Sequence, residues 1–174
     1  MEPDRERALN MSDFSIRFFA ADDLERVQDI AELAWKPIFD SYRNLLGEEI
    51  LSQTRPLAEK DKRDQLAGWA KNHPDKIIVA VDKNQKIIGF ATWNLDEVHK
   101  VGIINNNAVD KTCGLKGVGQ ALYAELFRIF KEAGMTLAQV TTGLDEGHAP
   151  ARKAYQRAGF GKANLESVTY YKKL

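Results

Sequence analysis

The chain has 174 residues, of which 44% are hydrophobic and 29% are charged, which suits one globular domain with a sizeable core. Basic and acidic residues number 25 each, so no global field favours binding to nucleic acid or an acidic membrane. The apolar runs are too short for a membrane span, and the charged N-terminal decapeptide is unlike a secretory signal. The single cysteine, Cys113, excludes an internal disulfide and a cysteine-built metal site. We therefore expect a soluble, cytoplasmic protein without a metal.

The N-terminal third predicts one strand followed by helices. We expect residues 1–12 to form a disordered leader and residues 13–174 a single domain, which begins with an alternating strand over 14–19. Asp22 and Glu25 resemble a capping box, and the helix that they open should stop near Trp35, because Lys36 precedes Pro37. Further helices are predicted over 38–47, closed by Gly47, and over 58–72, with 48–58 unassigned.

The rest of the chain alternates between strands and helices. A hairpin is predicted from strands 76–81 and 86–95, because the intervening DKNQ is typical of a turn. A third strand over 100–109 precedes an apolar-faced helix that Gly134 ends. The order then continues with strand 136–142, helix 149–158 and strand 166–174. This order predicts a mixed sheet with helices packed on it.

Three consecutive asparagines, residues 105–107, interrupt the apolar third strand. Asparagine is a poor strand former, so the run favours a bulge whose backbone groups leave the ladder and become available to a ligand. The alternative, with equal weight, is that the asparagines face solvent near the end of the strand.

The glycine-rich segment GLKGVGQ, residues 114–120, leads directly into a helix. The first amides of a helix have no acceptor within it, and glycines let a phosphate approach them closely, with Lys116 as a nearby cation. A Walker loop fits poorly, because Gln120 and Ala121 stand where Lys and Ser or Thr would be needed. A dinucleotide fingerprint is also weak, because Leu122 replaces its third glycine. The alternative is that this segment is an ordinary glycine-rich turn that binds no ligand.

A second motif lies downstream in GHAPARKAYQRAGF, residues 147–160, where Tyr155 stands four residues before Gly159 and Phe160. Together with Gly114, Gly117 and Gly119, this motif resembles the GNAT superfamily of acyl-CoA-dependent N-acyltransferases over roughly residues 14–174. The resemblance implies an α/β fold: a mixed, mostly antiparallel central sheet flanked by helices, with a splayed strand pair that holds acyl-CoA. Gly114 departs from the family's usual Arg or Gln, and His148 stands where Asn is common.

The resemblance also implies the site residues. The bulged strand would offer backbone groups to the pantetheine arm, the glycine loop would hold the pyrophosphate, and Tyr155 would act as the general acid. A residue such as Val118 or Gln120 would contribute its backbone amide. The cofactor-binding residues implied are Asn107, Ala108, Val109, Gly114, Leu115, Lys116, Gly117, Val118, Gly119, Gln120, His148 and Ala151.

The implied reaction is transfer of an acetyl group from acetyl-CoA to a primary amine of a small molecule or peptide by direct attack. No nucleic-acid, membrane or metal partner is expected, and a homodimer is compatible with the family. The general base stays unassigned, because Asp96, Glu97 and His99 read as turn residues. The aromatic residues Trp35, Tyr42 and Trp93 could line an acceptor pocket or belong to the core. Two alternatives are an acyl-CoA-binding module without turnover and a nucleotide-binding domain.

Overall fold

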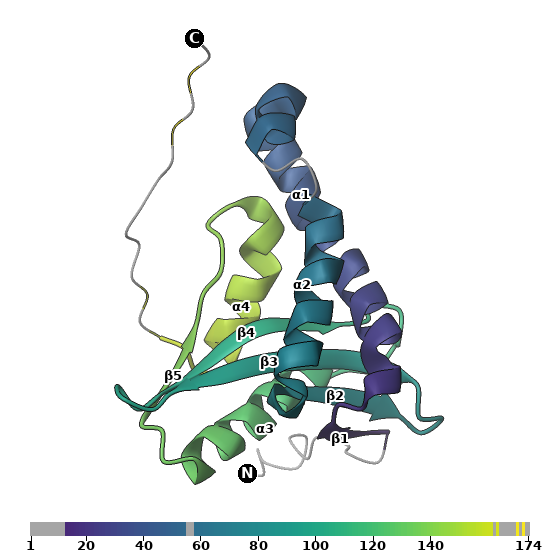
Figure 1. Ribbon diagram of the computed structural model, residues 1–174, viewed down its shortest axis with the longest axis vertical. Helices are drawn as coiled ribbons and strands as arrows, with labels where there is room; N and C mark the ends of the chain where they lie inside the picture. The colour runs from purple at the N-terminus through teal and green to yellow at the C-terminus, as the bar shows by residue number, and fades with distance from the viewer. Residues whose placement is uncertain (1–12, 55–57, 162, 164–169, 171, 173–174) are drawn as a thin grey trace, which may run out of the picture.

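The computed structural model describes residues 13–54, 58–161, 163, 170 and 172. Its centre is a five-stranded sheet in which the strands follow their order in the sequence (Figure 1). The first four strands pair antiparallel, and the fifth pairs parallel to the fourth. The predicted mixed, mostly antiparallel sheet is therefore confirmed. The strands are β1 (Phe14–Phe18), β2 (Ile77–Asp82), β3 (Ile87–Asp96), β4 (Val101–Val109) and β5 (Leu137–Val140).

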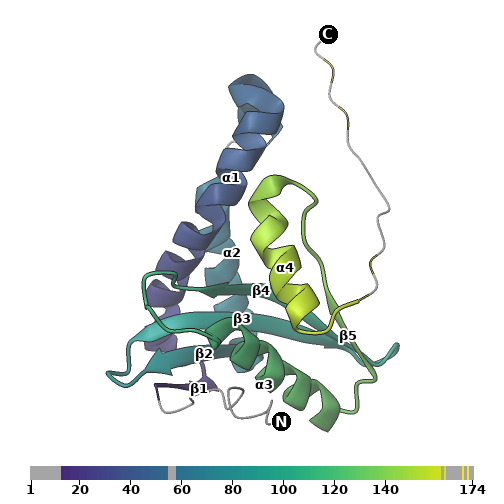
Figure 2. The ribbon, with the colours of Figure 1, turned by 180° about the vertical axis from the view of Figure 1, so that it is seen from behind.

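Helices cover both faces of the sheet. Helices α1 (Leu24–Thr54) and α2 (Ala58–Asn72) pack together on one face, and α3 (Val118–Glu132) crosses the other face (Figures 1 and 2). Helix α4 (Ala149–Arg157) follows β5 and contacts α3. Short 3-10 turns precede α1, β2 and α4; they are η1 (Ala21–Asp23), η2 (Pro74–Lys76) and η3 (Glu146–His148).

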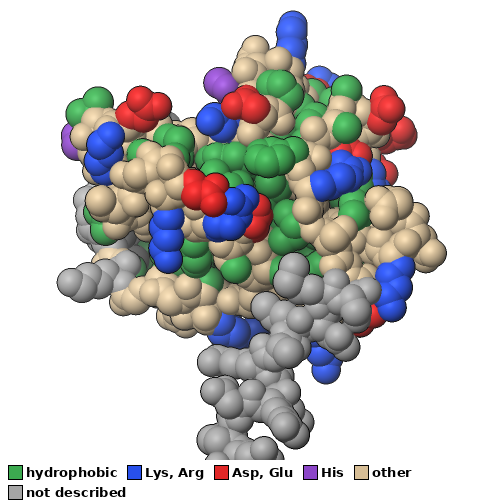
Figure 3. Space-filling model, turned by 90° about the horizontal axis from the view of Figure 1, so that it is seen from below, with side chains coloured by type: hydrophobic (Ala, Val, Ile, Leu, Met, Phe, Trp, Pro, Cys, Tyr) green, Lys and Arg blue, Asp and Glu red, His purple; other side chains and the backbone are tan. Residues whose placement is uncertain are grey.

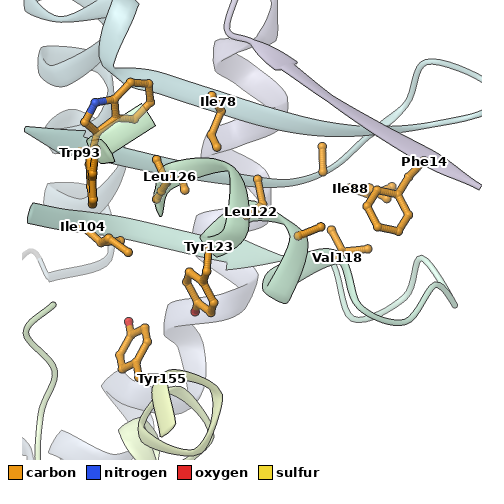
Figure 4. Packing of buried hydrophobic residues seen from close by; sticks show 14 of the residues in the cluster. Phe14, Ile78, Ile88, Trp93, Ile104, Val118, Leu122, Tyr123, Leu126 and Tyr155 are labelled. Carbon is orange, nitrogen blue, oxygen red and sulfur yellow. The ribbon is translucent and has the colours of Figure 1, made fainter. Parts of the chain in front are cut away.

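Each face of the sheet has its own hydrophobic cluster. On the α3 face, Leu122 and Leu126 are buried against Ile78, Trp93 and Ile104 (Figure 4). On the other face, residues of α1 and α2 are buried against β2, β3 and β4; they include Val27, Ile30, Leu66, Val79, Phe90 and Ala108. Burial of each large side chain contributes about 1.5–3 kcal/mol, so these two clusters hold the helices on the sheet.

Two predictions for the first helix are wrong. The helix does not stop near Trp35 but continues through Pro37 as far as Gly47, where a non-helical φ of 74° breaks it. The predicted closure at Gly47 is therefore confirmed, and a further helical segment runs from there to Thr54. Pro37 removes one backbone hydrogen bond, but Ile38 and Phe39 are buried directly after it and keep the turn in place. The capping carboxylate is that of Asp23 rather than Asp22, since its Oδ2 accepts from the backbone N–H of Ala20 at 2.7 Å.

The other described elements agree with the sequence-based expectations. Helix α2 begins at Ala58 and ends at Asn72, as predicted for 58–72. Gly134 ends α3 in a left-handed conformation with φ 75°. The predicted leader 1–12 lies outside the described residues, and so does strand 166–174 apart from Tyr170 and Lys172. Within the described ranges, each helix is too short or too polar to cross a membrane. Basic and acidic side chains alternate over the surface shown in Figure 3, in keeping with the zero net charge.

Candidate functional site

A bulge in β4 lies at the asparagine run. Ala91 of β3 pairs with Asn107 and Trp93 pairs with Ile104, so Asn105 and Asn106 together oppose Thr92 alone. The Thr92 hydroxyl accepts from the backbone N–H of Asn106 at 2.9 Å, which fixes the extra residue. The predicted bulge is therefore confirmed.

The bulge changes which face of the sheet each β4 residue meets. Ile104 packs in the cluster on the α3 face, and Ala108, four residues later, packs in the cluster on the α1 and α2 face. A regular strand would place both residues on the same face, because side chains alternate with a period of two. As a consequence Asn106 faces α2 and Asn107 faces α3 and α4, the reverse of the arrangement that a regular strand would give.

Strands β4 and β5 part at the bulge. Their pairing runs from Val101 with Leu137 to Ile104 with Val140 and stops there. Beyond the bulge, residues 107–109 still pair with β3 on one edge, and no described strand pairs with their other edge. The backbone groups on that edge are thus available to a ligand lying between the two strands.

Asn107 joins the splayed strand to two buried phenols. Its Oδ1 accepts from the Tyr123 hydroxyl at 2.8 Å, and its Nδ2 donates to the Tyr155 Oη at 3.1 Å. The two rings lie 5.7 Å apart, and Figure 4 shows their hydroxyl groups pointing toward each other. One amide therefore fixes a residue of α3 and a residue of α4 at the same point of β4.

These contacts leave the Tyr155 O–H free to donate. Because its oxygen already accepts from Asn107, the phenolic proton can be directed at a third group. Burial raises the pKa of Tyr155, and the hydrogen bond from Asn107 opposes that rise. Burial also raises the pKa of Tyr123. Both phenols consequently stay protonated throughout the neutral range.

The glycine loop enters α3 with its leading amides directed outward. Gly117 is the N-cap, with φ 82°, and the first helical hydrogen bond runs from the Ala121 N–H to the Gly117 carbonyl at 2.9 Å. The amides of residues 118–120 precede that bond and have no acceptor within the helix. The positive end of the helix dipole lies at the same place. This terminus has the donors and the potential that an anionic group needs.

Gly119 leaves space at that terminus. A Cβ atom built there would come no closer than 3.7 Å to the Val109 side chain, an ordinary contact, and its φ is not positive. Neither packing nor backbone strain within the protein therefore requires glycine at this position. A ligand approaching the amides would supply the requirement, so the residues present fit a pyrophosphate.

A partly buried ion pair anchors the start of the loop. The Asp110 carboxylate accepts from the backbone N–H of Thr112 at 2.8 Å and from its hydroxyl at 2.6 Å, and it forms a salt bridge with Arg26 of α1. The hydrogen bonds from Thr112 and the charge of Arg26 lower the pKa of Asp110 despite its burial. These contacts therefore fix the path of the loop from the end of β4 to the N-terminus of α3.

A second fixed loop lies before α4. Arg152 donates to the backbone carbonyls of Gly143 and Asp145 at 2.7 and 2.8 Å. Asp145 Oδ2 lies 2.5 Å from His148 Nδ1, and although burial raises the pKa of Asp145, hydrogen bonds from His148 and Ser41 lower it overall. The imidazole is thereby oriented, and only its Nε2 is left for a ligand.

The structure brings most of the predicted site residues to one region. Asn107 and Val109 lie on the splayed strand, residues 114–120 form the loop and first turn of α3, and Ala151 and Tyr155 lie on α4. The side chains of Ala108 and Val118 are buried in the two clusters, so only their backbone groups can meet a ligand. Among the aromatic candidates, Trp93 is a core residue.

Sequence reasoning missed Tyr123, Asp145 and the ion pair of Arg26 with Asp110. Tyr123 belongs to the apolar pattern of α3, and no local signal separates it from a core residue. Asp145 could have been noticed three residues before His148, a spacing at which one turn brings two side chains together. Arg26 and Asp110 are 84 positions apart, and only the tertiary structure joins them.

Comparison with known proteins identifies the family to which the chain belongs. The model of the acetyltransferase (GNAT) family matches residues 31–160, and the chain belongs to this family. Membership supports acyl transfer as its class of reaction.

A mycothiol acetyltransferase from Segniliparus rotundus is 32% identical over 114 residues, which are 62% of this chain and 41% of that protein. The match thus spans less than half of the relative. Among solved structures, the PaiA N-acetyltransferase of Thermoplasma acidophilum, in complex with coenzyme A, has a TM-score of 0.62 at 19% identity, with 88% of this chain and 92% of that one covered. Ard1 from Thermoplasma volcanium has a TM-score of 0.62 at 20% identity, with 87% and 84% covered. At 19% and 20% identity, these two structures show that the fold is shared and nothing more.

Proposed function

We propose that the protein is an N-acetyltransferase that moves an acetyl group from acetyl-CoA to a primary amine of a small molecule or peptide by direct attack. The observation that carries the proposal is the convergence of three features: the splayed edge of β4, the outward amides of α3, and Tyr155 held by Asn107 at 3.1 Å. A thioester ligand of this length needs all three at once.

In this proposal the pyrophosphate binds at the loop and first turn of α3, with Gly114, Leu115 and Gly117 shaping the loop and Lys116 as an exposed cation beside it. The loop can do this without the family's usual Arg or Gln because its backbone amides do not depend on the side chain at position 114. Gly114 itself has φ 72°, a conformation that favours glycine. The pantetheine arm follows the free edge of Asn107, Ala108 and Val109, and the small side chain of Ala151 together with the Nε2 of His148 would contact its other side.

The phenol of Tyr155 would assist departure of the thiolate. A thiol has a pKa of about 8.5, so hydrogen-bond donation from a protonated phenol stabilises the thiolate as the carbon–sulfur bond breaks. The tetrahedral oxyanion would be stabilised by backbone N–H groups at the bulge. An amine with a pKa of about 10.4 costs roughly 4.6 kcal/mol to deprotonate at pH 7, so an efficient acceptor site must also remove a proton.

The acceptor would approach the bulge from the face of α1 and α2, where Trp35 lies beside the sheet. Asp96 and His99 are not assigned as its base, because they lie in the exposed β3–β4 turn, where Asp96 pairs with Val101 at the end of β4 away from the bulge. A cytoplasmic location, a single domain over 13–174 and homodimer formation complete the proposal.

Release of free thiol from acetyl-CoA in the presence of a panel of primary amines tests this function. Acetyl-CoA should stabilise the protein against heat, and at least one amine should give thiol and an acetylated product of equal amount. Binding of acetyl-CoA with no thiol release from any amine would favour the binding module without turnover. Stabilisation by NAD or ATP and none by acetyl-CoA would favour the nucleotide-binding domain.

A further inference from the structure

Lys62 of α2 reaches the bulge of β4 from the face opposite Tyr155. Its Nζ donates to the Asn106 Oδ1 at 2.8 Å, and Asn106 itself is buried. The next residue, Asn107, turns to the other face and holds Tyr155. Two adjacent asparagines thus place an amine and a phenol on opposite sides of the point where β4 and β5 separate.

The surroundings of Lys62 contain no carboxylate partner that would hold it as an ammonium ion. In addition to Asn106, its Nζ donates to the Gln65 Oε1 at 2.8 Å, and it lies 4.2 Å from the centre of the Trp35 ring, a contact that favours the charged form and works against the effect of burial. Both hydrogen-bond partners are uncharged amides, and no described Asp or Glu forms a salt bridge with Lys62. A neutral amine has two N–H donors and one lone pair, so the two amide oxygens occupy both donors and leave the lone pair free. Burial lowers the pKa of Lys62 to about 8.

Lys60, on the same helix, differs from Lys62. Lys60 is exposed and forms a salt bridge with Asp64 at 2.9 Å, and its pKa is raised, chiefly by the hydrogen bond to that carboxylate. At pH 7.5 an amine with a pKa near 8 is neutral in about a quarter of molecules, against about one in a thousand at the reference pKa of lysine. Lys62 therefore presents a neutral amine far more often than Lys60 does.

We propose that Lys62 is a self-acetylation site, whose neutral amine attacks an acetyl-CoA thioester bound at the bulge of β4. This inference rests on the proposed function, because it needs acetyl-CoA in the opening between β4 and β5. The Lys62 nitrogen forms a bond with the carbonyl carbon, and the carbon–sulfur bond breaks. The nitrogen loses one proton and the departing thiolate gains one, so the products are an acetylated lysine and free coenzyme A. The amide is stable in water and accumulates.

The test incubates the full chain with acetyl-CoA at pH 7.5, without an acceptor, and measures acetylation of each lysine by peptide mass spectrometry. Lys62 should be acetylated at least about tenfold more than Lys60, its matched control on the same helix. The Lys62→Arg variant, which keeps a cation but has no neutral amine, should lose the main adduct. Equal acetylation of Lys62 and Lys60 would overturn the proposal, because it would reflect non-specific chemistry.

A second variant separates bound from free thioester. Gly117→Val should reduce acetylation of Lys62 by acetyl-CoA to the level of Lys60, whereas acetic anhydride, which needs no cofactor site, should still favour Lys62 in that variant. Acetylation by acetyl-CoA that persists in Gly117→Val would contradict the proposal. Calorimetric titration with acetyl-CoA distinguishes the two possible failures. Binding with an unmodified Lys62 overturns this inference alone, and absence of binding overturns the proposed function as well.

Discussion

Asn107 donates to the Tyr155 Oη at 3.1 Å and accepts from the Tyr123 hydroxyl at 2.8 Å. A side chain of the bulged strand therefore sets the position of the phenol that we propose as proton donor. If Asn107 orients Tyr155, Asn107→Ala should lower kcat for thiol release by about tenfold or more and change KM for acetyl-CoA less. Asn105→Ala is the control, because Asn105 bonds to Asn94 rather than to a tyrosine. Equal loss in both variants would show that the asparagine run matters only for folding.

The two tyrosines should differ in their effect on catalysis although they share one partner. Tyr155→Phe removes the proton donor and should lower kcat by about 10²-fold, within the usual range for general acid catalysis. Tyr123→Phe removes only a hydrogen bond to Asn107 and should cost about 1 kcal/mol of stability with a small change in kcat. Steady-state kinetics and urea unfolding of both variants check this. A Tyr155→Phe enzyme with the kcat of the parent would exclude the assigned role.

Asp110 should make stability depend on acid pH. Because its pKa is lowered in the folded protein, its contribution is fully present above the unfolded value of about 3.9 and is lost as pH falls through the folded pKa. Asp110→Asn should cost about 1–3 kcal/mol at pH 7, since it leaves the partly exposed Arg26 without its charged hydrogen-bond partner. The difference in unfolding free energy between parent and variant should shrink below pH 4. A difference that stays constant from pH 7 to pH 3 would contradict this account of the ion pair.

Local sequence patterns predicted most of the fold because each element has a strong signal of its own. The hairpin of β2 and β3, the apolar stripe of α3 and its end at Gly134 are all read from neighbouring residues. The passage of α1 through Pro37 was missed because proline is a local helix breaker, whereas the burial of Ile38 and Phe39 that overrides it is tertiary. Tertiary packing decides such conflicts, and a single sequence does not display it.

The candidate site was predictable in its parts and not in its connections. The glycine loop, the asparagine bulge and Tyr155 each carry a recognisable pattern. The hydrogen bonds of Asn107 with two tyrosines, of Lys62 with Asn106, and of Arg26 with Asp110 join residues 16 to 84 positions apart. No periodicity or spacing encodes contacts over such separations.

The central claim is that the leading amides of α3 bind the pyrophosphate of coenzyme A, and the affinity of coenzyme A for two matched glycine variants tests it most directly. Gly117 and Gly134 stand at opposite ends of α3 with φ of 82° and 75°, so replacing either by valine imposes a similar strain of about 1–2 kcal/mol. Measured by calorimetry, the Kd of coenzyme A should rise at least about tenfold in Gly117→Val and stay near the parent value in Gly134→Val. An unchanged Kd in a folded Gly117→Val protein would contradict the account.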